Sequence, residues 1–198
     1  MNIQNFVHIE NFISLFNPDE LLFCDQIIKY FESRKELHLS GSTSSGINGI
    51  LKSTTEIAIT PNHIEKNFIF VEDYINFIMQ CYVNYLQKWP ILKDFTTNVE
   101  IGVFSILKYN AGDHFNKLHT ERMTYGTLQR VLVWMTYLND VEEGGHTQFE
   151  YLNTTIKPTK GLTLLWPSDW THAHRGCSVI KGNKYIITGW IDLTLPPI

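Results

Sequence analysis

The sequence predicts a mainly β domain in which a jelly roll is buttressed by N-terminal helices. Helical spacing of apolar residues dominates the first hundred residues, whereas short runs rich in valine, isoleucine, threonine and aromatic residues dominate the last hundred. Short strands without intervening helices favour an antiparallel sandwich or jelly roll. We therefore expect one domain over 1–198, with a helical support layer and a flexible loop over 1–95 and a β core over 96–198.

Two helices are predicted in the N-terminal half. The segment Asn17-Pro18-Asp19-Glu20 is typical of a helix start, with Asn17 as the N-cap, and apolar spacing continues to about Ser33. A longer helix is predicted over 64–89, where Pro90 ends it, and its apolar face should pack against a sheet. Residues 38–49, rich in serine, threonine and glycine, are predicted to form a mobile loop, either a lid or a plain surface connection.

The C-terminal half contains runs that predict strands. Turn signals such as Asn110-Ala111-Gly112-Asp113 and Gly144-Gly145 separate these runs, and Asp113 and Asp140 are interpreted as turn formers. The predicted strands span 99–109, 131–138, 147–151, 162–166 and 185–191.

The bulk composition is that of a globular protein without an obvious polyanionic partner. The chain has 198 residues, 18% charged and 13% aromatic, with a net charge of −4, which argues against disorder and against nucleic acid as a partner. No signal sequence or apolar run long enough to cross a membrane is visible. An odd number of cysteines, three, argues for a reducing compartment, so we expect a cytoplasmic protein. The oligomeric state is not indicated.

Four residues in the last part of the chain have a chemically specific arrangement. His119-Thr120-Glu121 places an imidazole and a carboxylate two positions apart, and in an extended segment these project to the same face. His174 follows 55 residues later and Lys184 ten residues after that. Two histidines and a carboxylate suit a non-haem Fe(II) with open coordination positions. Alone, these residues support only a metal site, as in a cupin-like binding module.

Several segments surround these residues in a fixed order, and together they resemble the 2-oxoglutarate/Fe(II) dioxygenases of the prolyl 4-hydroxylase type. The resemblance covers about residues 100–192. The segments that carry it are Tyr109-Asn110-Ala111-Gly112, Phe115, His119-Thr120-Glu121, Arg130, Tyr137-Leu138-Asn139-Asp140, Glu142-Glu143-Gly144-Gly145-His146-Thr147-Gln148-Phe149, Lys157-Pro158-Thr159-Lys160-Gly161, Trp166-Pro167-Ser168, His174-Arg175-Gly176, Gly182-Asn183-Lys184-Tyr185 and Gly189-Trp190.

The resemblance implies a fold, a cofactor set and a metal site. The fold would be a double-stranded β-helix, and the catalytic iron ligands would be His119, Glu121 and His174. The enzyme would use Fe(II), 2-oxoglutarate as co-substrate, O₂ and ascorbate. Lys184 would pair with the distal carboxylate of 2-oxoglutarate, because a buried ammonium needs a partner.

Four further positions match pocket residues of the family. Tyr137 matches a position whose hydroxyl helps to hold the co-substrate carboxylate, and Tyr109 matches another pocket-lining position. Arg130 and Trp190 match positions near the substrate mouth. Trp166, Trp170 and Trp190 are candidates for an apolar pocket lining.

Glu121 departs from the family pattern, in which the carboxylate ligand is usually Asp. Glu keeps the charge and the ligand type, and similar members from marine microbes and their phages also carry Glu here. His146 is a second departure, because acidic or polar residues are usual at this position in the family. Among the other histidines, His172 would share a strand face with His174, but the spacing to Lys184 favours His174 as the ligand. His114 lacks a carboxylate two residues later.

The activity that the resemblance implies is hydroxylation of an unactivated C–H bond. The favoured reaction is prolyl 4-hydroxylation of a peptide or protein, like that of a procollagen-proline 4-dioxygenase. Alternatives are a hydroxylase of a free amino acid or small metabolite, or a catalytically silent metal- or peptide-binding jelly roll.

Overall fold

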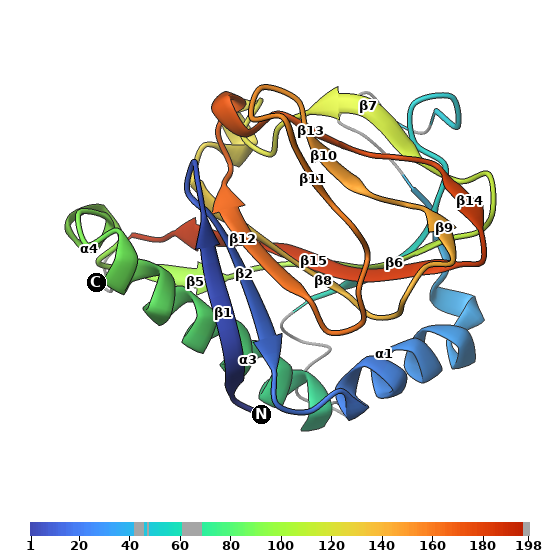
Figure 1. Cartoon of the computed structure of the whole chain (residues 1–198), viewed down its shortest axis with the longest axis horizontal. Helices are drawn as coiled ribbons and strands as arrows, with labels where there is room; N and C mark the ends of the chain where they lie inside the picture. Colours follow the sequence, from blue (N-terminus) through green and yellow to red (C-terminus); the bar gives the residue numbers. More distant parts are fainter. Residues whose placement is uncertain (42–45, 47, 61–68, 196–198) are drawn as a thin grey trace.

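The computed structural model describes residues 1–41, 46, 48–60 and 69–195. Two antiparallel sheets face each other, and helices cover the outer face of the larger sheet (Figure 1). The strands at the centre of the larger sheet are β8 (Arg130–Tyr137), β15 (Lys184–Leu193) and β6 (Phe104–Tyr109). The mainly β architecture that the sequence predicts is therefore present, with the helices on one side.

The larger sheet has nine strands in the order β1-β2-β12-β8-β15-β6-β4-β3, and β5 also pairs with β15. Its outer strands come largely from the N-terminal part of the chain. Their bounds are Ile3–Ile9 (β1), Ile13–Pro18 (β2), Leu39–Ser40 (β3), Thr55–Ile59 (β4), Val99–Ile101 (β5) and Thr163–Pro167 (β12).

The smaller sheet has four strands in the order β11-β10-β13-β7, and a separate two-stranded ribbon joins β14 to β9. All of these strand pairs are antiparallel. The bounds are Phe115–His119 (β7), Glu143–Gly144 (β9), Thr147–Phe149 (β10), Thr154–Ile156 (β11), His174–Gly176 (β13) and Val179–Lys181 (β14).

Three α-helices lie among the described residues: α1 (Leu22–Ser33), α3 (Ile69–Lys88) and the short α4 (Leu92–Phe95). Short 3₁₀ turns occur at Lys35–Leu37, Tyr125–Thr127 and Trp170–His172. As predicted, α3 ends just before Pro90 and packs an apolar face into the core, with Tyr74, Ile78, Cys81, Tyr82 and Tyr85 buried. None of the described helices has the length and apolar character needed to span a membrane.

The alternation of side chains along the central strands divides the interior into two cores. On β15, Tyr185 and Ile187 face the helices, whereas Lys184 and Ile186 face the space between the sheets. On β6, Ile106 belongs to the helix-side core. This alternation explains how one sheet supports an apolar helical layer on one face and a polar pocket on the other.

Gly189 is needed where β15 crosses behind a large aromatic side chain. A Cβ at this position would lie 2.5 Å from Cζ2 of Trp134 and 2.7 Å from Cβ of Phe104. Both neighbours are fully buried, so they have little room to move. Glycine therefore lets the centre of the sheet pack closely beneath the helices.

The prediction that residues 1–95 form only helices and loop is wrong. The hairpin β1–β2 precedes α1, and β3 and β4 add a further edge to the larger sheet. Asn17 lies within β2 and donates from Nδ2 to Oδ1 of Asn5 across the hairpin at 2.7 Å, so it does not cap a helix. The helix α1 begins later, after Leu21, without a side-chain cap.

Other boundaries differ in detail. The predicted strand 99–109 is interrupted and forms β5 and β6, because β5 pairs only with the end of β15. The strands β7, β9, β11, β13 and β14 are too short to give a clear alternating pattern. Much of the predicted loop 38–49 and the predicted start of the second helix lie outside the described residues.

Candidate metal centre and binding pocket

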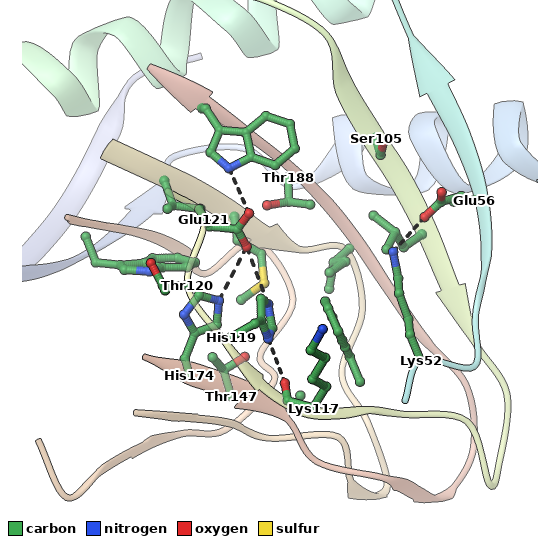
Figure 2. A pocket seen from close by; sticks show the side chains of 18 of the residues that line it. Lys52, Glu56, Ser105, Lys117, His119, Thr120, Glu121, Thr147, His174 and Thr188 are labelled. Atoms are coloured by element: carbon green, nitrogen blue, oxygen red, sulfur yellow. Dashed lines mark hydrogen bonds and ion pairs between the residues drawn. The ribbon is translucent and has the colours of Figure 1, made fainter. Parts of the chain in front are cut away.

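His119 and His174 face each other on neighbouring strands of the smaller sheet. His119 is the last residue of β7, His174 is the first residue of β13, and the antiparallel register pairs them directly. Their ring centroids are 4.4 Å apart. Glu121 follows β7 and turns its carboxylate towards both rings (Figure 2). Strand pairing thus brings together residues that are distant in the sequence.

The three side chains present their ligand atoms to a common point. Oε1 of Glu121 lies 3.4 Å from Nε2 of His119 and 3.6 Å from Nε2 of His174, and the ligand atoms all lie within 4.8 Å of one another. Among the described residues, no other group of three such side chains meets in this way. Two imidazoles and one carboxylate are the donor set of a facial Fe(II) site.

Hydrogen bonds on the far side of each ring orient both histidines. Nδ1 of His119 lies 2.8 Å from the carbonyl oxygen of Lys117, and Nδ1 of His174 lies 2.9 Å from that of His172. A carbonyl oxygen can only accept, so Nδ1 carries the proton and donates in each case. In the neutral ring Nε2 therefore keeps its lone pair for a metal, and the donor set fits Fe(II).

The surroundings favour the metal-binding protonation states of the ligands. Burial would raise the pKa of the Glu121 carboxyl, but the adjacent imidazoles of His119 and His174 outweigh burial and lower this pKa well below its usual range. Burial lowers the pKa of His174, and the nearby His119 lowers it further. A carboxylate and a neutral imidazole are the forms that coordinate a metal.

A cavity of about 330 Å³ opens beside the triad, and Lys184 forms part of its wall. The side chain of Lys184 is only 2% exposed, and its Nζ donates to the carbonyl oxygen of Gly145 at 3.0 Å. Burial lowers the pKa of Lys184 to about 8. No carboxylate in the described part of the chain pairs with this ammonium, so an anionic ligand would stabilise it.

The two tyrosines predicted for the pocket lie in different positions. The ring of Tyr109 lines the cavity, and Nζ of Lys184 lies 4.3 Å from its centroid. Tyr137 is fully buried and donates its hydroxyl to Oγ1 of Thr147 at 2.6 Å. Thr147 itself lines the cavity, whereas Tyr137 lies behind it. Thr147 is thus a pocket residue to which the sequence analysis assigned no role, although it lies in one of the segments that carry the resemblance.

Arg130 and Trp190 line the cavity and both contact Glu121. Nε1 of Trp190 donates to Oε2 of Glu121 at 3.1 Å. Nη1 of Arg130 donates to the backbone carbonyl of Glu121 at 3.0 Å and lies 3.5 Å from Oε2. The guanidinium carbon lies 3.4 Å from the Trp190 ring centroid. Both residues predicted for the substrate mouth therefore also touch a predicted metal ligand.

An ion pair in the cavity wall comes from the N-terminal half of the chain. Nζ of Lys52 lies 2.8 Å from Oε2 of Glu56, and both side chains are mostly buried (Figure 2). Glu56 belongs to β4, which pairs with β6 so that Glu56 lies opposite Leu107. The sequence did not reveal this pair because β4 was not predicted, and no local motif marks either residue.

The competing histidines do not belong to the triad. Nε2 of His172 donates to the carbonyl oxygen of Asn11 at 2.6 Å, and Nδ1 accepts from the hydroxyl of Thr171, which ties the β1–β2 turn to the 3₁₀ turn before β13. His114 and His146 are not part of the metal-ligand group, and His38 stacks on Phe31. Of the candidate tryptophans, Trp166 and Trp190 line the cavity, but Trp170 is 70% exposed.

Comparison with known proteins gives a match over the strands that carry the triad and Lys184. The model of the 2OG-Fe(II) oxygenase superfamily matches residues 104–192. Prolyl 4-hydroxylase 13 of Arabidopsis thaliana is 34% identical over 116 residues, which is 44% of this chain and 42% of that protein. Prolyl 4-hydroxylase subunit alpha-1 of Homo sapiens is 32% identical over 73 residues, 33% of this chain and 14% of that protein. The chain thus spans less than half the length of these relatives.

Solved structures show the same fold over nearly the whole chain. A viral collagen prolyl hydroxylase from Paramecium bursaria Chlorella virus-1, in complex with 2-oxoglutarate, superposes with a TM-score of 0.67 at 18% identity, covering 94% of this chain and 98% of that one. A prolyl hydroxylase from Trichoplax adhaerens, bound to a peptide fragment of hypoxia inducible factor, gives a TM-score of 0.71 at 15% identity, covering 92% and 84%. The predicted double-stranded β-helix is thereby confirmed.

Proposed function

Because residues 104–192 match the model of the 2OG-Fe(II) oxygenase superfamily, we propose that the chain is a 2-oxoglutarate-dependent dioxygenase that hydroxylates a prolyl residue in a peptide or protein. One observation carries this proposal. The facial donor set lies in the wall of the same cavity as a buried ammonium that no described carboxylate neutralises. A metal site alone would need no such ammonium, whereas an oxo-acid co-substrate has a second carboxylate to place.

His119, Glu121 and His174 would hold the iron through Nε2, Oε1 and Nε2. Three protein ligands leave positions open for the co-substrate and O₂. When bound, Fe(II) and 2-oxoglutarate supply an oxidative decarboxylation to succinate and CO₂ that is coupled to transfer of one oxygen atom into a C–H bond. The chain itself contributes the ligand geometry, the protonation states described above and a cavity that limits access of water.

Lys184 would receive the distal carboxylate of 2-oxoglutarate. Its ammonium group already lies at hydrogen-bonding distance from Gly145 and beside the Tyr109 ring, so its position is fixed before the co-substrate arrives. Thr147, which accepts a hydrogen bond from Tyr137, can donate its own hydroxyl hydrogen into the cavity. Tyr137 would therefore act on the carboxylate through Thr147, and Tyr109 would line its site.

Substrate class rests on the relatives and on the residues at the pocket mouth. The relatives named above are prolyl hydroxylases, and one solved neighbour holds a peptide. Arg130 and Trp190 would lie where such a substrate approaches the metal.

Ascorbate would keep the iron reduced. Free thiols at Cys24, Cys81 and Cys177 support a reducing, cytoplasmic location.

Mass spectrometry of proline-containing peptides after incubation with Fe(II), 2-oxoglutarate, ascorbate and O₂ tests the substrate. The expected product carries one additional oxygen atom on proline, and a peptide with alanine in its place should remain unchanged. Hydroxylation of a free amino acid, without hydroxylation of any peptide, would instead indicate a small-molecule hydroxylase. Metal binding without any turnover of 2-oxoglutarate would instead indicate a silent binding module.

A further inference from the structure

The two carboxylate oxygens of Glu121 face different partners. Oε1 is directed towards Nε2 of His119 and of His174. Oε2 is directed away from the histidines, towards the indole N–H of Trp190 at 3.1 Å and Nη1 of Arg130 at 3.5 Å. Because each oxygen has its own set of contacts, the orientation of the carboxylate is fixed (Figure 2).

The contacts to Oε2 come from two central strands of the larger sheet. Arg130 and Trp190 lie on the paired strands β8 and β15 in the centre of the larger sheet. The guanidinium group stacks on the indole at 3.4 Å from its centroid and also holds the backbone carbonyl of Glu121. Glu121 itself follows a strand of the smaller sheet. The contacts therefore join the loop that carries Glu121 to the opposite sheet.

We propose that Arg130 and Trp190 are positioning residues for Glu121, and that they make this site specific for Glu as its carboxylate ligand. Their contacts occupy Oε2, so that only Oε1 is free to coordinate the metal. A carboxylate that used both oxygens would occupy an additional coordination position, which the co-substrate or O₂ needs. This inference rests on the proposed iron site.

Side-chain length explains the preference for Glu. An Asp at position 121 would be shorter by one C–C bond, about 1.5 Å. With the backbone carbonyl held by Arg130, such a carboxylate could not contact the imidazole side of the site and the Trp190 indole together, since the Trp190 bond is already 3.1 Å long. The two contacts to Oε2 therefore require the longer side chain of Glu121.

A double-mutant cycle with Co(II) tests this inference without relying on turnover. Dissociation constants and visible spectra of Co(II) are measured for the wild type, Trp190→Phe, Glu121→Asp and the double variant. Trp190→Phe should weaken Co(II) binding by about tenfold or more, the typical effect of removing an outer partner of a metal ligand, and should alter the spectrum. In the Glu121→Asp background the same change should alter the affinity by less than about twofold.

Arg130→Lys should behave like Trp190→Phe, because lysine keeps the charge but loses the planar stack and the forked donors. Trp134→Phe is a matched control, since its indole nitrogen is buried without a hydrogen-bond partner among the described residues. Its effect on folding stability is read separately by thermal unfolding, and its Co(II) affinity should equal that of the wild type.

The outcomes separate this inference from the proposed function. Equal losses from Trp190→Phe in the Glu and Asp backgrounds, or a loss below about threefold in the Glu background, would overturn the positioning role while leaving the iron site intact. Absence of stoichiometric Co(II) binding in the wild type would instead contradict the iron site itself.

Discussion

His119 and His174 donate their Nδ1 hydrogens to the carbonyl oxygens of residues 117 and 172, so each ring is anchored by the backbone two positions before it. The same hydrogen bond on both rings sets the tautomer and directs both Nε2 atoms to Oε1 of Glu121. The two histidine ligands are therefore preorganised by backbone carbonyl groups, one in β7 and one in the 3₁₀ turn before β13.

Removing two members of the triad should abolish metal binding. The double variant Glu121→Ala, His174→Ala leaves one imidazole, and we expect loss of stoichiometric Co(II) binding and of succinate formation from 2-oxoglutarate. Isothermal titration calorimetry and a succinate assay measure the two effects. The matched control is His146→Gln, which should bind Co(II) like the wild type because His146 is outside the ligand group. Turnover that survives in the double variant would contradict the assigned ligands.

Neutralising Lys184 should weaken 2-oxoglutarate binding without affecting the metal. A charge-assisted hydrogen bond contributes about 1.5–3 kcal/mol, so Lys184→Met should raise the KM for 2-oxoglutarate by about tenfold to a hundredfold. Steady-state kinetics with varied co-substrate measures this effect. Lys181→Met removes an exposed lysine from the neighbouring ribbon strand and should leave the KM unchanged. An unchanged KM in Lys184→Met would place the carboxylate elsewhere.

The affinity for 2-oxoglutarate should decrease above about pH 8. Burial lowers the pKa of Lys184 to about 8, so its charged form prevails below this pH and is lost as the pH rises through it. The dissociation constant should then increase by about tenfold per pH unit, and binding should take up a proton. Calorimetry in buffers of different ionisation enthalpy measures both quantities. The Lys184→Met variant should lack this dependence, and a wild type with constant affinity from about pH 7 to 9 would contradict the role of its charge.

Gly189→Ala should destabilise the fold. The new Cβ would lie 2.5 Å from the Trp134 ring in a closely packed core, and overpacking of this kind costs about 1–3 kcal/mol. The loss of folding stability should lower the urea concentration at the midpoint of unfolding. Gly126→Ala is the control, because a methyl group at position 126 would meet no described atom within 4 Å beyond its chain neighbours. Equal stability of the two variants would show that the sheet can relax around position 189.

The metal and co-substrate residues could be identified from sequence because they follow local patterns in a fixed order. His119 and Glu121 are two residues apart, and Lys184 follows a turn glycine at the start of a strand. The structure brings these residues to one cavity, although His119 and His174 meet only through the pairing of β7 with β13. That pairing depends on contacts distant in the chain, which no local pattern encodes.

The N-terminal half was harder to predict for physical reasons. The strand β1 is mostly exposed on both faces, so it lacks the alternating apolar pattern that identifies a half-buried strand. The Asn-Pro-Asp-Glu segment has the composition of a helix start, but hairpin pairing holds Asn17 and Pro18 in β2. Tertiary pairing therefore overrode the local preference. The position of β4, and with it the Lys52–Glu56 pair, likewise depends on pairing with a distant strand.

The contacts of Arg130 and Trp190 to Glu121 could not be derived from sequence either. Their positions in the motif order indicate the pocket, but the direction of each side chain depends on the register of β8 against β15. Only the three-dimensional arrangement shows that both residues contact the carboxylate that departs from the usual Asp.

Succinate released from 2-oxoglutarate, measured together with hydroxylated peptide in the same reaction, is the most direct test of the proposed dioxygenase activity. We predict that both products form in equal amounts, that they require Fe(II) and O₂, and that both disappear in the Glu121→Ala, His174→Ala variant. Purified protein that binds Fe(II) through the triad yet releases no succinate with any proline-containing peptide, nor without one, would contradict this activity.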